Sequence, residues 1–294
     1  MYVITGATGN IGSRIAEKLL SGGKTVRVVG RSAEKLQPFV DKGAEPFVGD
    51  LADTDAMARA FTGAEAVFVL IPPNFAAPDH RAYQNEVGES LANAIREAGV
   101  KNVVNLSSVG AHLPEKVGVI KGLFDQEQRL NTLEGVNVLH LRPAFFMENH
   151  FLQIDMIKGN GIMGSPVKPD IPIFQIATAD IADYAAERLV HLDFSGKTVR
   201  ELLGPEEMTM DEATQVLGKA IGKEDLKFVR FSYEDAHRGM TGMGISEDVV
   251  SEMMELYRSF NEGICRPTEP RSAENTTPTT LEQFSKTFAA IYKS

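Results

Sequence analysis

The sequence predicts an α/β protein built on a doubly wound, mainly parallel sheet, and three observations carry this prediction. Strand-like and helix-like segments alternate through the first half of the chain, as parallel strands with helical crossovers require. A glycine-rich turn over residues 5–12 joins the first strand-like segment to the first helix-like one. The 294 residues, 43% of them hydrophobic, suffice for one large domain with a smaller appendage.

The first half of the chain contains six strand-like segments with helical segments between them. Residues 2–5 are short, apolar and β-branched, and Ile11, Ile15 and Leu19 then recur at helical spacing until Gly22-Gly23. Ser32 is placed to cap the next helix. The expected strands are residues 2–5, 25–29, 45–48, 66–71, 102–106 and 136–141. Further helices are expected at residues 53–61, 79–98 and about 120–133.

The rhythm changes after Arg142-Pro143. Helices are expected at residues 178–192, 210–221 and 246–261, and strands at 198–203 and 226–231. Thr280 and Gln283 match a capping box before a last helix that ends near Tyr292. Residues 267–278 look like a linker. The expected plan is a core over residues 1–150 and a smaller C-terminal α+β substrate region over residues 151–294, with at least one element returning to the core.

Composition narrows the function and the location of the protein. The net charge of −10 argues against direct binding to nucleic acid. The one cysteine, Cys265, cannot form an internal disulfide; it is either a packed thiol or a nucleophile. No signal-peptide pattern, membrane-spanning apolar run or metal-ligand spacing is visible, so we expect a cytoplasmic protein without a metal.

The glycine-rich turn has the context of a dinucleotide-binding fingerprint, between a strand and a helix. Its glycines allow a tight turn and a close approach to a pyrophosphate, which the N-terminus of the helix would bind. The sequence therefore predicts a Rossmann core. The turn residues expected at the cofactor are Gly6, Thr8, Gly9, Asn10, Ile11 and Gly12.

The ends of the next strands indicate which dinucleotide is bound. Arg31 stands where an acidic residue would favour NAD(H), so NADP(H) is preferred and NAD(H) is the alternative. Ser32 can add a hydrogen bond to the cofactor. Asp50 and Leu51 follow the third strand near the expected adenine, although Asp50 is equally suited to a turn. Ile71-Pro72 follows the fourth strand. These two residues either form a rigid wall beside the cofactor or belong to an ordinary loop.

Four segments of the chain resemble the NmrA-like family, a branch of the atypical short-chain dehydrogenases/reductases. They are residues 5–12, 106–110, 141–149 and 177–182, with a weaker likeness at 278–284. The resemblance implies a Rossmann fold, a nicotinamide cofactor and a position for Pro143 near the nicotinamide. It also implies one of two functions: NADPH-dependent reduction of quinones, dyes or related small molecules, or dinucleotide binding by a regulator without turnover.

The acid–base pair of ordinary short-chain dehydrogenases is missing. Ser107 and Ser108 occupy the position of the serine that orients a substrate carbonyl, and Ser108 is the candidate catalytic residue. No tyrosine occurs between Ser108 and Gly135, and Lys121 has Val117 four residues before it. A Tyr–Lys pair is therefore absent, which argues against alcohol oxidation and sugar epimerisation.

The leading hypothesis is hydride transfer from NADP(H) to a small quinone-like or aromatic acceptor, with solvent supplying the proton. Phe145 and Phe146 offer apolar surface for a flat ring and Asn149 a hydrogen bond, unless these are ordinary core residues. His112 and His150 are either proton donors or packing residues. The alternative function is a non-catalytic NAD(P)H sensor that acts through a protein partner. The chain is expected to be a monomer or a homodimer.

Overall fold

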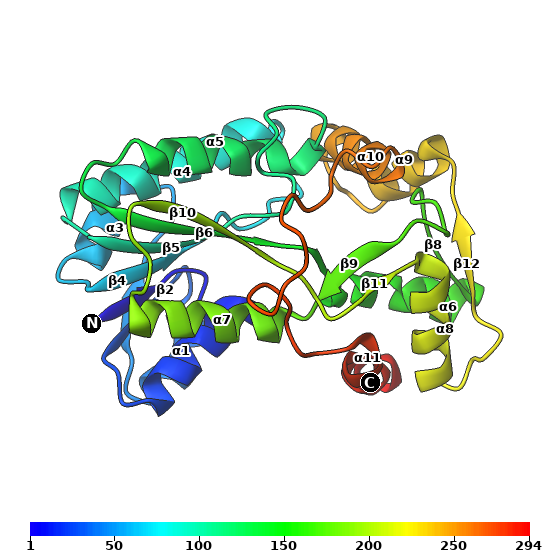
Figure 1. The fold of residues 1–294 in the computed structure, drawn as a ribbon, viewed down its shortest axis with the longest axis horizontal. Helices are drawn as coiled ribbons and strands as arrows, with labels where there is room; N and C mark the ends of the chain where they lie inside the picture. The colour runs from blue at the N-terminus through cyan, green and yellow to red at the C-terminus, as the bar shows by residue number, and fades with distance from the viewer.

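A seven-stranded parallel sheet forms the centre of the computed structural model, which describes residues 1–294 (Figure 1). Its strands are β1 (Tyr2–Ile4), β2 (Val26–Gly30), β3 (Glu45–Val48), β4 (Ala66–Val69), β5 (Asn102–Leu106), β6 (Asn137–Pro143) and β10 (Lys197–Leu202). They lie in the order β10-β6-β5-β4-β1-β2-β3, so the chain winds outward in both directions from the β4–β1 pair. This order confirms the predicted doubly wound sheet.

Helices cover both faces of the sheet and bury two apolar layers. One face carries α1 (Asn10–Ser21), α2 (Ala33–Val40) and α7 (Thr178–His191). The other carries α3 (Thr54–Phe61), α4 (His80–Glu97) and α5 (Lys121–Asn131), with a short 3-10 helix η1 (Gly118–Ile120) before α5. Figure 1 shows α4 and α5 above the sheet and α1 and α7 below it. None of the helices combines the length and apolar character needed to cross a membrane.

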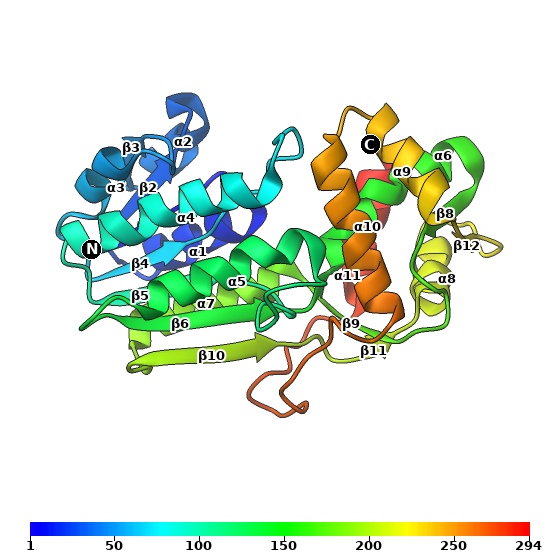
Figure 2. The same cartoon turned by 90° about the horizontal axis from the view of Figure 1, so that it is seen from above.

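The later part of the chain builds a smaller α+β region beyond the carboxyl ends of the strands (Figure 2). It holds two small sheets, β11-β9-β7 and β12-β8, around a third apolar core. Its strands are β7 (Phe145–Phe146), β8 (Ile162–Ser165), β9 (Ile173–Ile176), β11 (Glu207–Met208) and β12 (Lys227–Arg230). Its helices are η2 (Met147–Gln153), α6 (Ile154–Asn160), α8 (Met210–Ala220), α9 (Tyr233–Gly242), α10 (Glu247–Asn261) and α11 (Leu281–Lys293).

Residues 267–278, which look like a linker in the sequence, are bonded to the edge of the sheet at both ends, although most of their side chains are exposed. The buried carboxylate of Glu201 on β10 accepts hydrogen bonds from the backbone N–H groups of Thr268 and Glu269, at 2.8 and 2.7 Å. Thr277 N–H donates to the carbonyl of Leu203, also at 2.8 Å. The prolines set the path of this segment, while its polar backbone groups are paired with the edge of the sheet.

Candidate functional site

The predicted glycine turn lies at the carboxyl end of β1 and is tightly packed. Gly6 has a φ of +61°, and a Cβ there would lie 2.9 Å from Cδ2 of Leu70. A Cβ on Gly12 would lie 2.3 Å from the carbonyl oxygen of Gly6. Both positions therefore require glycine, and no side chain at Gly6 or Gly9 separates this backbone from a ligand.

The N-terminus of α1 is left free for a ligand. Gly9 is its N-cap residue and supplies no side-chain hydrogen bond, and its first turn holds no acidic residue. By contrast, α2, α3 and α4 are capped by Ser32, Asp53 and Asp79. The free N–H groups and the positive end of the helix dipole suit a pyrophosphate, so this turn fits a dinucleotide.

The other residues of the turn divide into two groups. Thr8 and Asn10 are exposed beside the helix N-terminus, where their side chains can reach a ligand. Ile11 is buried in the core under α1. Its side chain packs inside the protein, so only its backbone is available for the cofactor.

The residues after β2 and β3 lie at the same end of the sheet. Arg31 is exposed directly after β2, whereas the Ser32 hydroxyl accepts a hydrogen bond from Lys35 N–H at 3.4 Å and caps α2. Asp50 Oδ1 accepts from Ala52 N–H at 3.0 Å, which makes Asp50 a turn residue. Leu51 is half-buried beside it. The guanidinium of Arg31 is thus the free cation of this group.

Tyr83 on α4 belongs to this group, although sequence reasoning missed it. Its hydroxyl donates to the carbonyl oxygen of Pro72 at 3.1 Å, and both Pro72 and Ile71 are half-buried. Burial raises the pKa of Tyr83, the charge of Arg31 opposes that rise, and the charge of Asp50 adds to it. Tyr83 lies in the first turn of α4 and carried no local signal; only the fold brings it to the strand ends.

The two serines after β5 have different environments. Ser107 is buried and donates to Glu127 Oε1 at 2.5 Å, and Arg142 binds the same carboxylate. Ser108 is partly exposed, and its hydroxyl donates to the carbonyl of Val109 at 2.9 Å. Val109 N–H in turn donates to the carbonyl of Pro143 at 3.0 Å. This bond holds the Ser108 loop beside Pro143, where sequence reasoning expects the nicotinamide.

The aromatic residues after β6 form a short strand. Phe145 and Phe146 are half-buried in β7, which pairs with β9, and Asn149 is exposed. His150 is buried with its Nε2 2.7 Å from Gln175 Oε1, and burial lowers its pKa. A histidine so enclosed and bonded packs the small sheet rather than supplying protons.

Lys121 is bound by two carboxylates of α10. Its ammonium is 3.1 Å from Glu252 Oε1 and 3.4 Å from Glu255 Oε2, both on α10. Val117, four residues earlier, is fully buried. Lys121 therefore holds α10 against the core.

Of the two remaining candidates of the sequence, Cys265 is buried and His112 is half-buried. Burial raises the pKa of the Cys265 thiol to about 12, so this cysteine stays protonated and packed. His112 borders a cavity of about 580 Å3 between its own loop and the segment after α10, and its Nδ1 is buried without a partner. Burial lowers the pKa of His112, which is therefore neutral near pH 7.

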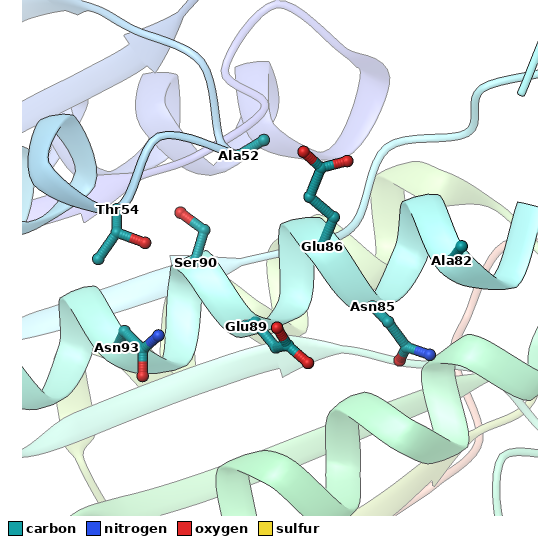
Figure 3. Close-up of a pocket in the computed structure, with 8 residues that line it drawn as sticks. All are labelled: Ala52, Thr54, Ala82, Asn85, Glu86, Glu89, Ser90 and Asn93. Carbon is teal, nitrogen blue, oxygen red and sulfur yellow. The ribbon is translucent and has the colours of Figure 1, made fainter.

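A separate polar groove of about 500 Å3 runs between α4 and the loop before α3 (Figure 3). Glu86, Glu89, Ser90 and Asn93 of α4 line it, and Figure 3 shows Glu86 and Ser90 directed towards the Ala52 loop. Two exposed carboxylates repel a pyrophosphate. The strand ends, with their free N–H groups and Arg31, fit a dinucleotide far better than this groove does.

Two curated proteins align with most of the chain. The NAD(P)H azoreductase of Xenophilus azovorans is 26% identical over 294 residues, covering 100% of this chain and 97% of its own length. Quinone oxidoreductase 2 of Escherichia coli K12 is 24% identical over 269 residues, or 90% of this chain and 89% of its own. The azoreductase alignment covers the whole chain and therefore includes the glycine turn and the C-terminal region.

Solved structures share the fold over nearly the whole chain. The NADPH-dependent quinone oxidoreductase of Escherichia coli, complexed with NADPH, has a TM-score of 0.78 and 21% identity, covering 98% of this chain and 99% of its own. A nucleoside-diphosphate-sugar epimerase of Staphylococcus aureus has a TM-score of 0.80 and 21% identity, covering 97% and 99%. At such identities the likeness shows the fold alone.

The family follows from the sequence as a whole. The segments that carried the resemblance all lie within one continuous match of the family model to residues 2–285. The chain belongs to the NmrA-like family.

Proposed function

We propose that this protein transfers a hydride from NADPH to a small quinone-like or aromatic acceptor. It is an NAD(P)H-dependent oxidoreductase, the class to which its azoreductase and quinone oxidoreductase relatives belong. The observation that carries the proposal is the uncapped N-terminus of α1 behind a glycine turn, with Arg31 exposed at the end of the next strand.

Each part of the site has a role in this proposal. The N–H groups of α1 bind the pyrophosphate, and Arg31 binds the 2′-phosphate that distinguishes NADPH from NADH. NADPH, when bound, supplies the hydride. The loops of Ser108 and Pro143 position the acceptor, and Phe145 and Phe146 provide apolar surface for its ring. Solvent supplies the proton, because no phenol–lysine pair is present in the Ser108 loop.

The cofactor half of the proposal is tested by isothermal titration calorimetry on the wild type and on Arg31→Ala. Loss of a charge-assisted contact to phosphate is expected to weaken NADPH binding by roughly 10–100-fold and to leave NADH binding nearly unchanged. Arg230→Ala, at an exposed arginine on β12, is the matched control. Equal weakening of both dinucleotides, or of neither, would contradict the assignment of Arg31 to the 2′-phosphate.

The reaction itself is tested by stopped-flow loss of NADPH absorbance with a panel of quinones and azo dyes. Turnover of at least one acceptor is expected, with slower turnover in a Phe146→Ala variant. Tight NADPH binding without turnover of any acceptor would overturn the enzymatic proposal. That outcome would favour the second candidate, a regulator that senses NADPH and acts through a protein partner. The absence of a tyrosine between Ser108 and Gly135 is the observation behind this candidate.

We also propose that the two parts of the chain have different roles. Residues 1–150 hold the dinucleotide, and residues 151–294 supply most of the acceptor or partner surface. The interleaved elements α7 and β10 belong to the core in this scheme.

A further inference from the structure

The loop between β4 and α4 is bonded to the start of α10. Ser246 N–H donates to the carbonyl of Phe75 at 2.9 Å, and the Ser246 hydroxyl donates to the carbonyl of Ala77 at 2.6 Å. His80 N–H donates to Asp248 Oδ2 at 2.7 Å. Figure 2 shows this loop reaching from α4 towards the helices of the C-terminal region. These three hydrogen bonds join two parts of the chain separated by about 170 residues in sequence.

The β4–α4 loop lies next to the switch point of the sheet, where β1 and β4 are neighbours. β1 and β4 are neighbours in the sheet, and the helices that follow them lie on opposite faces. This switch point between the β1–α1 turn and the β4–α4 loop is where a doubly wound sheet is expected to bind a dinucleotide. Because Ser246 and Asp248 at the start of α10 bind the second of these loops, they fix one side of the expected site.

Two buried polar side chains near these bonds each have an atom without a hydrogen-bond partner. His80 Nδ1 and Glu252 Oε2 face each other at 3.7 Å, and neither atom has a hydrogen-bond partner. Both residues are more than nine-tenths buried, at 4% and 8% exposure. Unpaired buried polar atoms oppose the closed contact, whereas the ion pair of Lys121 with Glu252 favours it. Because these contributions oppose each other, the contact between the β4–α4 loop and α10 can open.

The two sides of the contact also expose apolar side chains. Phe75 in the loop is 52% exposed, and Met243, three residues before Ser246, is 74% exposed. Large exposed apolar residues on two segments that are bonded together gain burial when the segments move closer. If the two segments move closer together, the exposed apolar surface of Phe75 and Met243 can be buried.

We propose that the β4–α4 loop and the start of α10 form a clamp that closes over the bound dinucleotide and sets its rate of exchange. The clamp consists of residues 74–80 and 246–248. It rests on the proposed function, since it needs a dinucleotide in the crevice. Ser246 and Asp248 are positioning residues in this scheme: they hold the loop, and the loop holds the ligand.

The test is the NADPH dissociation rate, measured by stopped-flow fluorescence as excess NADP+ displaces bound NADPH. The double variant Ser246→Ala/Asp248→Ala loses two clamp hydrogen bonds, and its dissociation rate is expected to rise about tenfold. The matched control is Ser232→Ala/Glu234→Ala, which alters the N-cap and the same first-turn position of α9, away from the loop. Its dissociation rate is expected to equal that of the wild type.

The outcomes separate the clamp from the proposed function. If the wild type binds NADPH and both double variants release it at the wild-type rate, the clamp is overturned and the proposed function stands. If the wild type does not bind NADPH, the proposed function falls and the clamp falls with it. If the double variant fails to fold, hydrogen exchange measured on the wild type provides a second test of the clamp. NADPH is expected to increase protection of residues 74–80, and equal protection with and without NADPH would overturn the clamp.

Discussion

At the scale of single residues, Gly12 carries the closest packing constraint in the glycine turn. A Cβ there would lie 2.3 Å from the Gly6 oxygen and 3.0 Å from the Thr5 oxygen. Gly12→Ala must therefore displace the start of α1 from β1. We expect a loss of about 1–3 kcal/mol in the free energy of unfolding, measured with urea, and weaker NADPH binding. Gly239→Ala on α9, where nothing lies within 4 Å, is expected to be neutral or stabilising.

A stable Gly12→Ala variant with unchanged affinity would show that the helix start can shift without cost. The cofactor site would then depend on the free N–H groups alone. The comparison with Gly239 matters because both substitutions add the same methyl group to a helix. Only the surroundings of the two glycines differ.

His140 makes the stability of the protein depend on pH. It is buried on β6, with Nδ1 3.1 Å from Asn105 Nδ2 and Nε2 3.1 Å from Asn131 Oδ1. The amide nitrogen of Asn105 can only donate, so a proton on Nδ1 would face another donor. Burial, the largest cause, lowers the pKa of His140 from its ordinary 6.5 to about 4. The neutral imidazole is therefore the form that the folded state accommodates.

The sign of the effect follows from the two states. The unfolded chain takes up a proton on His140 near pH 6.5 and the folded protein near pH 4, so stability falls as the pH drops through this window. The loss reaches about 3 kcal/mol for this one residue. Urea unfolding between pH 4 and 7 should show a shallower pH dependence in His140→Gln than in the wild type. His191→Gln, at an exposed histidine, should keep the wild-type profile, and an unaltered profile in His140→Gln would refute the assignment.

At the scale of elements, the core could be predicted because its segments are long and regular. The first helix repeats Ile11, Ile15 and Leu19 on one face, and all three are buried. The elements that sequence reasoning missed lack such a pattern. β7 has only two residues, which is too short for an alternation to register. α9 buries none of its residues, so its sequence has no apolar face at helical spacing that would predict it.

The same reasoning explains which candidate site residues the sequence could place together. Gly6, Arg31 and Asp50 lie within two residues of the ends of their strands, and in a parallel sheet the strand ends gather at one edge. Tyr83 reaches that edge from a helix, which only the packing of α4 on the sheet determines. Likewise, nothing in the Ser107-Ser108 pair indicates that Ser107 turns inward to Glu127. That division depends on Arg142 of β6, which already binds the carboxylate of Glu127 on α5.

At the scale of the whole molecule, the two regions share their core and their hydrogen bonds. α7 covers the sheet face beside α1, and Arg14 of α1 binds Asp183 of α7 with two hydrogen bonds, at 2.9 and 2.8 Å. β10 pairs over its full length with residues Val138 to Pro143 of β6. The buried carboxylate of Asp180 accepts from Thr279 N–H and Oγ1, which fixes the chain before α11. The sheet formed mainly by residues 1–150 is therefore completed by residues that come after it in sequence.

This sharing predicts how fragments behave. A fragment of residues 1–150 lacks β10 and α7, so β6 becomes an exposed edge strand and the apolar face under α7 meets water. Exposed edges and apolar faces of this size favour aggregation. A fragment of residues 1–203 restores both elements and is expected to give a larger soluble fraction and a cooperative urea transition. A soluble, cooperatively folding 1–150 fragment would show instead that α7 and β10 dock on a core that is already stable without them.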